Sequence, residues 1–462
     1  MYNLFFHPLR HIPGPLAWRA TNLPWSWTLI SGRLPFTVLS LHQQYGPVVR
    51  IRPDEVSFSD PRAWQDIYGH KVVGKMAGLT SGLKELPKYD RFYKRFPKQP
   101  GSFLTADWHD HATQRRLIAP SFSDKSMREQ EPILTEYIDL LMRRLYENAD
   151  DGPVNLREWY NWATFDIMGD LAFGDSFGCL RSNTYHPFVS LIAGNPRINA
   201  VLISLRYMGL TKLTLLIFAV FVKTRKTVRS YGIQTMERRL AVGNPRPDLI
   251  EPFIEKKTKG ELSYEQLVIT AAVFIIAGSE TTASLLTGVT FLLLTHPEAL
   301  AKATAEVRAA FKSEKDITLN GVQNLKYMIA CLTEALRYYP PAPAGFPREV
   351  PEGGAIIADT PLPPEVSTSL WSHYPSFGKA DGLSDSRVCI SLGVAPHGQQ
   401  LGAAVRVPAR ALARGRDLCR RQQGRIQAFF LWATGLRWQE VSLCLSPEML
   451  SSFHLRMEPN GD

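Results

Sequence analysis

A carboxylic acid and two adjacent threonines stand in the middle of the apolar run Leu267–Leu294, in the stretch IIAGSETTAS. If this run is a helix, Thr281 lies four residues after Ala277, so its hydroxyl can bond to that carbonyl oxygen and open the regular hydrogen-bond ladder. Gly278 removes a side chain at the same level and leaves room for a ligand beside the backbone. Glu280, next to the hydroxyl, can relay protons. The combination predicts a small-molecule pocket with proton delivery.

Two other interpretations of this run stay open. Its length and its single charge, Glu280, also fit a membrane-spanning helix, which needs roughly 20 apolar residues. Against a span stand the charge at its centre, which is costly in a bilayer, and a capping-box pattern at its start, where Ser263 and Gln266 are three apart. A threonine that bonds back to the preceding turn also occurs in ordinary core helices.

The elements that must position this run are mainly helical. Apolar residues at helical spacing predict helices within residues 121–149, 159–178, 263–294, 295–311 and 325–341, the last stopped by two prolines. Alternation of apolar and polar residues predicts a short hairpin over 48–60. Proline and glycine in residues 7–16 indicate an extended, hinge-like segment. We therefore expect one mainly α domain with a minor β region.

Composition and charge narrow the class of protein. Of the 462 residues, 45% are hydrophobic and 21% charged, which is typical of a globular chain with a sizeable core. Five cysteines without a CxxC pair argue against a disulfide framework or a structural zinc site. The net charge of +10 is concentrated between Leu401 and Arg425, which carry seven arginines and one acid, so we expect no nucleic-acid partner.

Composition changes abruptly after about Phe377. The following stretch lacks sustained apolar periodicity and is dominated by Gly, Ala, Arg and Pro. The sequence therefore divides into a proline-rich hinge at 1–15, of the kind that follows a membrane anchor, a main domain at 16–377, and an aberrant segment at 378–462.

Two motifs resemble those of the cytochrome P-450 monooxygenases. Ala277 to Thr282 match the oxygen-activation motif (A/G)Gx(D/E)T(T/S), and Glu334-Ala335-Leu336-Arg337 match the ExxR motif of a later helix. HPLRHIPGP resembles the family's hinge, and DLAFGDSFGCL resembles fungal members that tailor secondary metabolites. The resemblance covers roughly Tyr2 to Phe377. It implies a heme b (iron protoporphyrin IX) enzyme with a cytochrome P-450-like fold whose C-terminal part is incomplete.

The resemblance assigns roles to individual residues. It implies that Ala277 and Gly278 lie against the heme, that Thr281 stabilises and protonates dioxygen there, and that Glu280 relays protons. Glu334 and Arg337 share a helix face and can pair. On a surface such a pair contributes under ~1 kcal/mol, but its apolar surroundings favour the buried structural pair that braces the family's core beside the heme.

Cations in the segment WHDHATQRRL are candidates for binding the two heme propionates. The family usually shows W-x-x-x-R here, but position 112 is alanine. We therefore carry the role to Arg115, with His111 as a helper, and the alternative is that both are solvated surface groups. Arg348, in GFPREV, is a second propionate candidate by resemblance.

The family pattern breaks at the axial iron ligand. A cysteine thiolate is required because its electron donation favours O–O cleavage, and the expected motif is FxxGxRxCxG. Cys389 has Arg387 two residues before it, but Gly382, Asp385 and Ser391 stand where Phe, Gly and Gly belong. Cys389 is therefore only a weak candidate for the metal ligand.

A slip of the reading frame is one specific hypothesis for this break. Ser391-Leu392-Gly393 resembles the start of an FSLGxRxCxG loop, and residues 417–432 resemble the tail of the helix that follows such a loop. The alanine- and arginine-rich stretch between them is typical of GC-rich DNA read out of frame. On this hypothesis the meander before the loop was skipped and the cysteine codon was lost. An uninterrupted transcript that encodes this sequence would overturn the hypothesis.

Three functions compete. The first is a heme-dependent monooxygenase that hydroxylates or oxidises a small lipophilic secondary metabolite with O2 and electrons from NADPH-cytochrome reductase. The second is a catalytically inactive or misread relative that lacks the axial cysteine. The third is a membrane-embedded helical binding protein. The resemblance further implies the cytosolic face of the endoplasmic reticulum membrane, with the membrane surface as a partner, although the sequence as written shows no spanning anchor at its start.

Overall fold

The computed structural model describes residues 1–69, 85–93, 102, 104–148, 154–193, 196–214, 222–243, 246–313, 316–343, 345–370 and 406–407. Helices dominate this part of the chain, as the apolar spacing predicts. They are α1 (Tyr2–Phe5), η1 (Pro8–His11), α2 (Leu16–Ala20), α3 (Leu23–Ile30), α4 (Leu34–Tyr45), α5 (Arg62–Tyr68), α6 (Asp90–Tyr93), α7 (Trp108–Ile118), η2 (Ala119–Phe122), α8 (Asp124–Glu147), α9 (Leu156–Phe173), α10 (Cys179–Ser182), α11 (Pro187–Ala193), α12 (Pro196–Tyr207), α14 (Val222–Val242), α15 (Glu251–Thr258), α16 (Tyr264–Thr295), α17 (Pro297–Ala310), α18 (Leu319–Val322) and α19 (Lys326–Tyr338).

The β region is small, which confirms the predicted fold class. One sheet has the order β1-β2-β7-β4, formed by Val48–Arg52, Glu55–Phe58, Ser367–Leu370 and Arg348–Glu349. β1 and β2 form the predicted antiparallel hairpin, and β7 joins β2 in parallel. β5 (Ala355–Ile357) pairs with β6 (Thr360–Leu362), and β3 (Val154–Asn155) pairs with β8 (Arg406–Val407).

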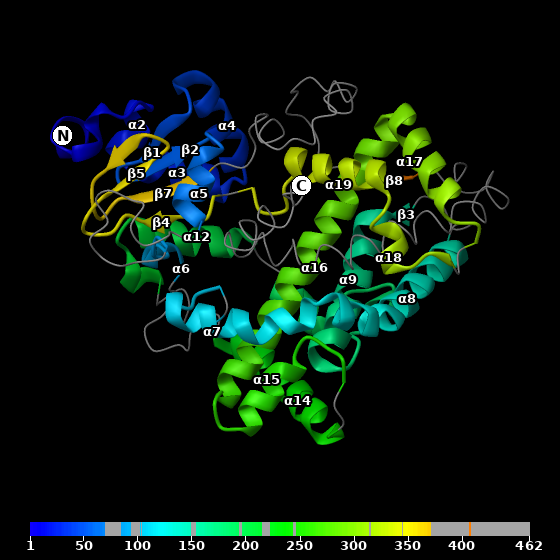
Figure 1. The fold of residues 1–462 in the computed structure, drawn as a ribbon. Helices are drawn as coiled ribbons and strands as arrows, with labels where there is room; N and C mark the ends of the chain where they lie inside the picture. The colour runs from blue at the N-terminus through cyan, green and yellow to red at the C-terminus, as the bar shows by residue number, and fades with distance from the viewer. Residues whose placement is uncertain are drawn as a thin grey trace, which may run out of the picture.

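The apolar run around Glu280 forms α16, which crosses the centre of the molecule (Figure 1). The sheet and the first helices lie on one side of it, α8, α9 and α17 lie on the other, and α19 passes across its upper end. Its start carries the predicted capping box, in which the Ser263 side chain and Gln266 bond reciprocally. α9 is its main neighbour, and Ser279 Oγ donates to the Thr164 carbonyl oxygen at 3.2 Å.

Burial accounts for the apolar length of α16. This is the one helix of the described residues long and apolar enough to cross a membrane, yet 67% of its most apolar window is buried inside the protein. Its core face packs into the main hydrophobic cluster with α9 and α19. The structure therefore does not support the alternative in which this helix spans a bilayer.

The segment at 7–16 is less extended than the sequence indicates. Pro8–His11 form a 3₁₀ turn, because the His7 side chain accepts from the Leu9 N–H and caps it. The chain then lies along β1, where the Arg50 N–H donates to the Pro13 carbonyl oxygen at 2.8 Å. A Cβ at Gly14 would lie 2.4 Å from the Arg50 oxygen, so only glycine allows this approach.

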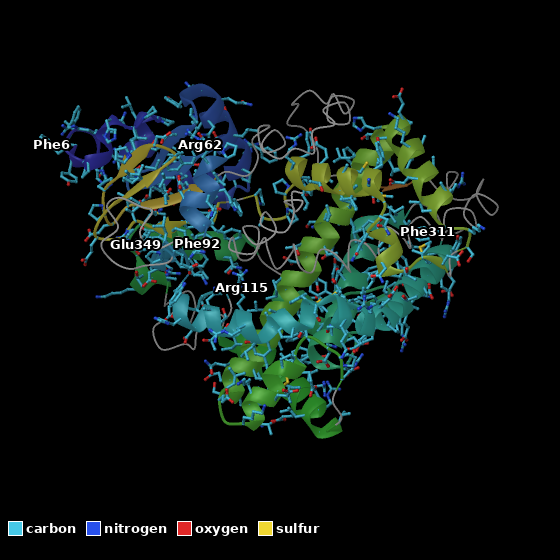
Figure 2. The ribbon with its side chains drawn as sticks, in the orientation of Figure 1. Phe6, Arg62, Phe92, Arg115, Phe311 and Glu349 are labelled. Carbon is cyan, nitrogen blue, oxygen red and sulfur yellow. The ribbon has the colours of Figure 1, made fainter. Side chains whose placement is uncertain are left out.

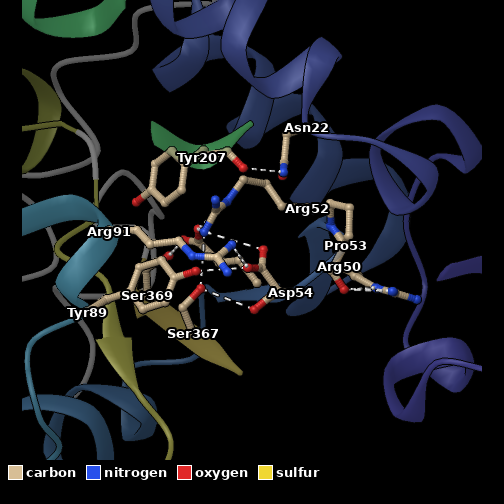
Figure 3. A network of polar contacts seen from close by, with 11 residues as sticks. Asn22, Arg50, Arg52, Pro53, Asp54, Tyr89, Arg91, Tyr207, Ser367 and Ser369 are labelled. Atoms are coloured by element: carbon tan, nitrogen blue, oxygen red, sulfur yellow. Dashed lines mark hydrogen bonds and ion pairs between the residues drawn. The ribbon is translucent and has the colours of Figure 1, made fainter. Parts of the chain in front are cut away.

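A buried arginine ties α12 to the sheet (Figure 3). Arg52 is fully buried, and its Nε donates to Glu55 Oε2 at 2.7 Å. Its guanidinium carbon lies 3.7 Å from the centre of the Tyr207 ring, at the end of α12. Asn22, just before α3, donates to the Tyr207 carbonyl oxygen at 2.9 Å. The sheet, α3 and α12 are thus held as one block beside α16.

Candidate functional site

The hydroxyl of Thr281 has the predicted back-bond. Its Oγ1 donates to the Ala277 carbonyl oxygen, one turn earlier, at an O···O distance of 2.5 Å. Thr281 is partly buried, whereas Ala277 and Gly278 are buried. The bond occupies a carbonyl that also takes part in the helix ladder, so the backbone at this turn can be loosened beside a ligand.

One stripe of α16 stays partly open although the helix is central. It runs through Val273, Ile276, Glu280 and Ser284, at spacings of three and four residues, with the partly buried Thr281 at its edge. Ile276 is 39% exposed, which is unusual for an isoleucine in a core helix. The open stripe is therefore the face of α16 on which a ligand can lie.

Glu280 lies on this stripe and is exposed to solvent. Desolvation by the surrounding protein raises the pKa of its carboxyl group, and Arg157 opposes the shift. A raised pKa lowers the cost of taking up and releasing a proton near neutral pH. The arrangement fits a proton relay between solvent and the Thr281 turn.

The ExxR pair lies on α19, and the end of α19 packs against α16. Arg337 Nε and Nη2 donate to the two oxygens of Glu334 at 2.7 and 2.6 Å, a bidentate pair. Two residues later the Tyr339 ring packs against Gly288, where a Cβ would lie 2.9 Å from the ring. Gly288 is seven residues from Thr281 and so lies on nearly the same face, about 10 Å along the helix.

The predicted helix over WHDHATQRRL is α7, and its start is capped by the Asp107 side chain, which accepts from the Asp110 N–H at 3.0 Å. His111 is buried, and Arg115 lies one turn later on the same face, partly buried. Burial lowers the pKa of Arg115, and Glu85 opposes the shift. Figure 2 places Arg115 between the sheet region and α16.

Arg348 begins β4 and is 2% exposed. Its Nη1 donates to the Leu86 carbonyl oxygen at 3.1 Å, and its Nε has no hydrogen-bond partner among the described residues. A buried guanidinium with an unused donor is costly, so an acceptor that is not part of the described chain fits there.

Comparisons with known proteins decide the family. The sequence model described as cytochrome P450 matches residues 12–373. The chain is 46% identical to the cytochrome P450 monooxygenase tpeC of Talaromyces stipitatus, over 84% of this chain and 77% of that protein. The chain belongs to the cytochrome P450 family. It is also 39% identical to an averantin hydroxylase of Dothistroma septosporum, over 80% of this chain and 69% of that protein.

A further relative is the versicolorin B desaturase stcL of Emericella nidulans, 38% identical over 82% of this chain and 75% of that protein. These relatives confirm the resemblance to fungal cytochrome P450 monooxygenases of secondary metabolism, and with it the expectation of an enzyme that uses heme b.

Two arginines of this P450 are suited to bind the propionates of a heme. The propionates are carboxylates, and Arg115 and the partly unsatisfied Arg348 are suitable donors for them. The axial ligand is a separate matter. Cys179 and Cys331 are the free cysteines of the described residues, and burial raises the pKa of their thiols to about 12 and about 11. Neither favours a thiolate, and Cys389 lies outside the described residues.

Two charged residues near Arg348 were missed from the sequence, Glu85 and Lys88. Their segment pairs with β4 through an isolated antiparallel bridge between Lys88 and Arg348. The partners are separated by some 260 residues, and neither periodicity nor a motif marks the segment ELPKYD. A buried glutamate beside the buried Arg348 and the partly buried Arg115 is visible only after folding.

Proposed function

We propose that this P450 hydroxylates a small lipophilic metabolite, with Thr281 and Glu280 as its catalytic residues. One observation carries the proposal: Thr281, with its hydroxyl bonded back to Ala277, directly follows the exposed acid Glu280 on the open side of the central helix. Heme, when bound, supplies the activation of dioxygen. A hydroxylase and a desaturase among the relatives support an oxidation of this kind.

The proposed work of the protein residues is the transfer of protons. Glu280 exchanges a proton with solvent, since part of its side chain is open and its pKa is raised. The Thr281 hydroxyl then donates toward the substrate side when its bond to the Ala277 oxygen opens. Ala277 and Gly278 keep that side of the helix free of bulky groups.

Arg115 and Arg348, with His111 on the same face of α7 as Arg115, are proposed to hold the propionates. Glu334 and Arg337 are proposed to brace α19 beside them, because each satisfies the other within a mostly buried pair. The roles differ in kind: the first three residues contact the cofactor, and the pair stabilises the scaffold.

Electrons are proposed to come from NADPH-cytochrome reductase on the cytosolic face of the endoplasmic reticulum membrane. The surface of the first helices supports a membrane-facing side. Large apolar side chains are exposed there, among them Phe6 at 70% and Trp27 at 73%. Phe6 lies at the outer edge of the molecule in Figure 2. No acid precedes Asp54, so anionic lipid is not repelled.

A second candidate is a P450-like chain that does not ligate iron. The missing FxxGxRxCxG pattern favours it, as do the high thiol pKa values of Cys179 and Cys331. The reduced carbon-monoxide difference spectrum of the heme-supplemented protein separates the two. A thiolate-type band that is lost in Cys389→Ser supports the enzyme and identifies its ligand. A spectrum like that of free heme supports the inactive form.

A further inference from the structure

Four charged side chains meet where the segment 85–89 joins β4. Arg348 and Lys88 are directly opposite residues of an antiparallel bridge. Arg115 approaches from α7, and the Glu85 carboxyl interacts electrostatically with all three cations. Glu85 is 5% exposed, so this charge cluster is mostly shielded from water. We define these residues as the propionate cluster.

From this geometry we infer that Lys88 is a third cation for the two carboxylates of the porphyrin. Glu85 is the opposite charge that lowers the net positive charge of the site. The inference rests on the proposed heme-dependent function, and it adds two residues that none of the motifs described above contains. Three cations surround the one buried carboxylate of Glu85, and Asp107 also acts on Lys88. The two propionates of a porphyrin would add negative charge among these cations.

The pairing of Lys88 with Arg348 is the first argument. Like charges directly opposite each other across two strands are destabilising. Here the arginine is buried and the lysine partly buried, so water screens their repulsion poorly. The backbone fixes this position, because the Glu349 N–H donates to the Pro87 oxygen at 2.8 Å. An anion between the two side chains would relieve the repulsion.

Unused hydrogen-bonding capacity is the second argument. Arg348 Nε and Glu85 Oε2 are both buried without a hydrogen-bond partner among the described residues. Glu85 therefore does not form the close bidentate pair with Arg348 that would complete both groups. The carboxylate lowers the positive potential of the cluster but leaves Arg348 Nε available for an external acceptor.

The ionisation of Lys88 and Glu85 agrees with the geometry. Burial and the neighbouring Arg348 lower the pKa of Lys88 to about 7, while Glu85 and Asp107 oppose the shift. Burial raises the pKa of Glu85 against the pull of the three cations. Without an external anion the cluster therefore holds its full positive charge poorly. Binding of two carboxylates favours the protonated form of Lys88.

The test uses the full-length, heme-free chain and metal-free protoporphyrin IX, which needs no axial ligand. Its dimethyl ester, with both carboxylates blocked, is the comparison ligand, and quenching of tryptophan fluorescence reports binding. Lys88→Met is expected to weaken binding of the diacid about tenfold and that of the ester less than about twofold. Lys88→Arg should restore binding of the diacid, and Glu85→Gln should make the diacid bind severalfold more tightly.

The exposed pair Lys125 and Glu129 of α8 supplies matched controls, since Lys125→Met and Glu129→Gln remove the same charges from exposed positions outside the cluster. Equal loss for diacid and ester in Lys88→Met would show a packing defect and overturn the inference. So would a wild-type protein that does not prefer the diacid. A missing thiolate-type spectrum together with a preserved diacid preference would sink the proposed function alone.

Discussion

The Thr281 hydroxyl is bonded to the Ala277 carbonyl oxygen one turn before it, at 2.5 Å, on the open stripe of α16. A second threonine of the same helix makes the same bond: Thr287 Oγ1 donates to the Ala283 oxygen at 2.7 Å. The two bonds are alike in geometry, but only Thr281 neighbours the acid. Variants of the two threonines can therefore be compared to separate a loss of proton delivery from a loss of helix stability.

Thr281→Ala is expected to lower the yield of product per NADPH consumed by at least about tenfold, because a positioned proton donor contributes roughly 10²–10⁴-fold. Thr287→Ala loses an equivalent back-bond and should keep a yield close to that of the wild type. Product and NADPH are measured together under reductase-supported turnover. Equal yields in the two variants would remove Thr281 from the mechanism.

Glu280→Gln is expected to stabilise the protein as the pH rises. The folded pKa of Glu280 is raised, so ionisation above it costs folding free energy, whereas below the unfolded pKa the cost is absent. The stability advantage of the variant should thus appear as the pH passes through the folded pKa. Thermal denaturation across pH measures it, with the exposed Glu352→Gln as control. A constant difference at every pH would contradict this assignment.

Lys88→Met should stabilise the heme-free protein at low pH while it weakens binding of the diacid. The lysine is depressed from 10.5 to about 7, so its penalty is complete below about pH 7 and fades toward pH 10.5. At about 1.4 kcal/mol per unit, the gain is at most roughly 5 kcal/mol. Loss of the Nζ bond to the Ala106 oxygen, 3.0 Å long, reduces it. Denaturant unfolding on both sides of neutral pH shows whether the advantage shrinks as the pH rises.

Arg52→Met is expected to destabilise the protein by about 3–5 kcal/mol, because it leaves Glu55 as a buried charge without its partner. The exposed Arg62 also bridges two acids, Asp60 and Asp359. Its replacement by Met should cost far less stability, because water screens exposed ion pairs. Equal midpoints of urea unfolding for the two variants would show that the buried network contributes no more than a surface pair.

Local patterns predicted most of the scaffold. The capping box of Ser263 and Gln266 and the hairpin of β1 and β2 both follow from short-range chemistry, and both are present. The 3₁₀ turn at Pro8–His11 was not predicted. Its cap depends on the orientation of one histidine, which proline spacing does not specify.

The site was only partly predictable. The Thr281 back-bond and the Glu334–Arg337 pair follow from spacings of four and three residues on a helix. Lys88, Glu85 and the Arg52 network depend on contacts between distant segments, for which one sequence offers no periodic signal.

The contact between Gly288 and the Tyr339 ring sets how closely α16 and α19 pack. Since even a methyl group there would press on the ring, alanine and then serine at position 288 would act as spacers of increasing thickness. Each substitution would push the two helices apart about two turns from Thr281. It would not change a charged or hydroxyl-bearing residue of the site. Graded steric variants of this one glycine would therefore vary the separation of α16 and α19 stepwise.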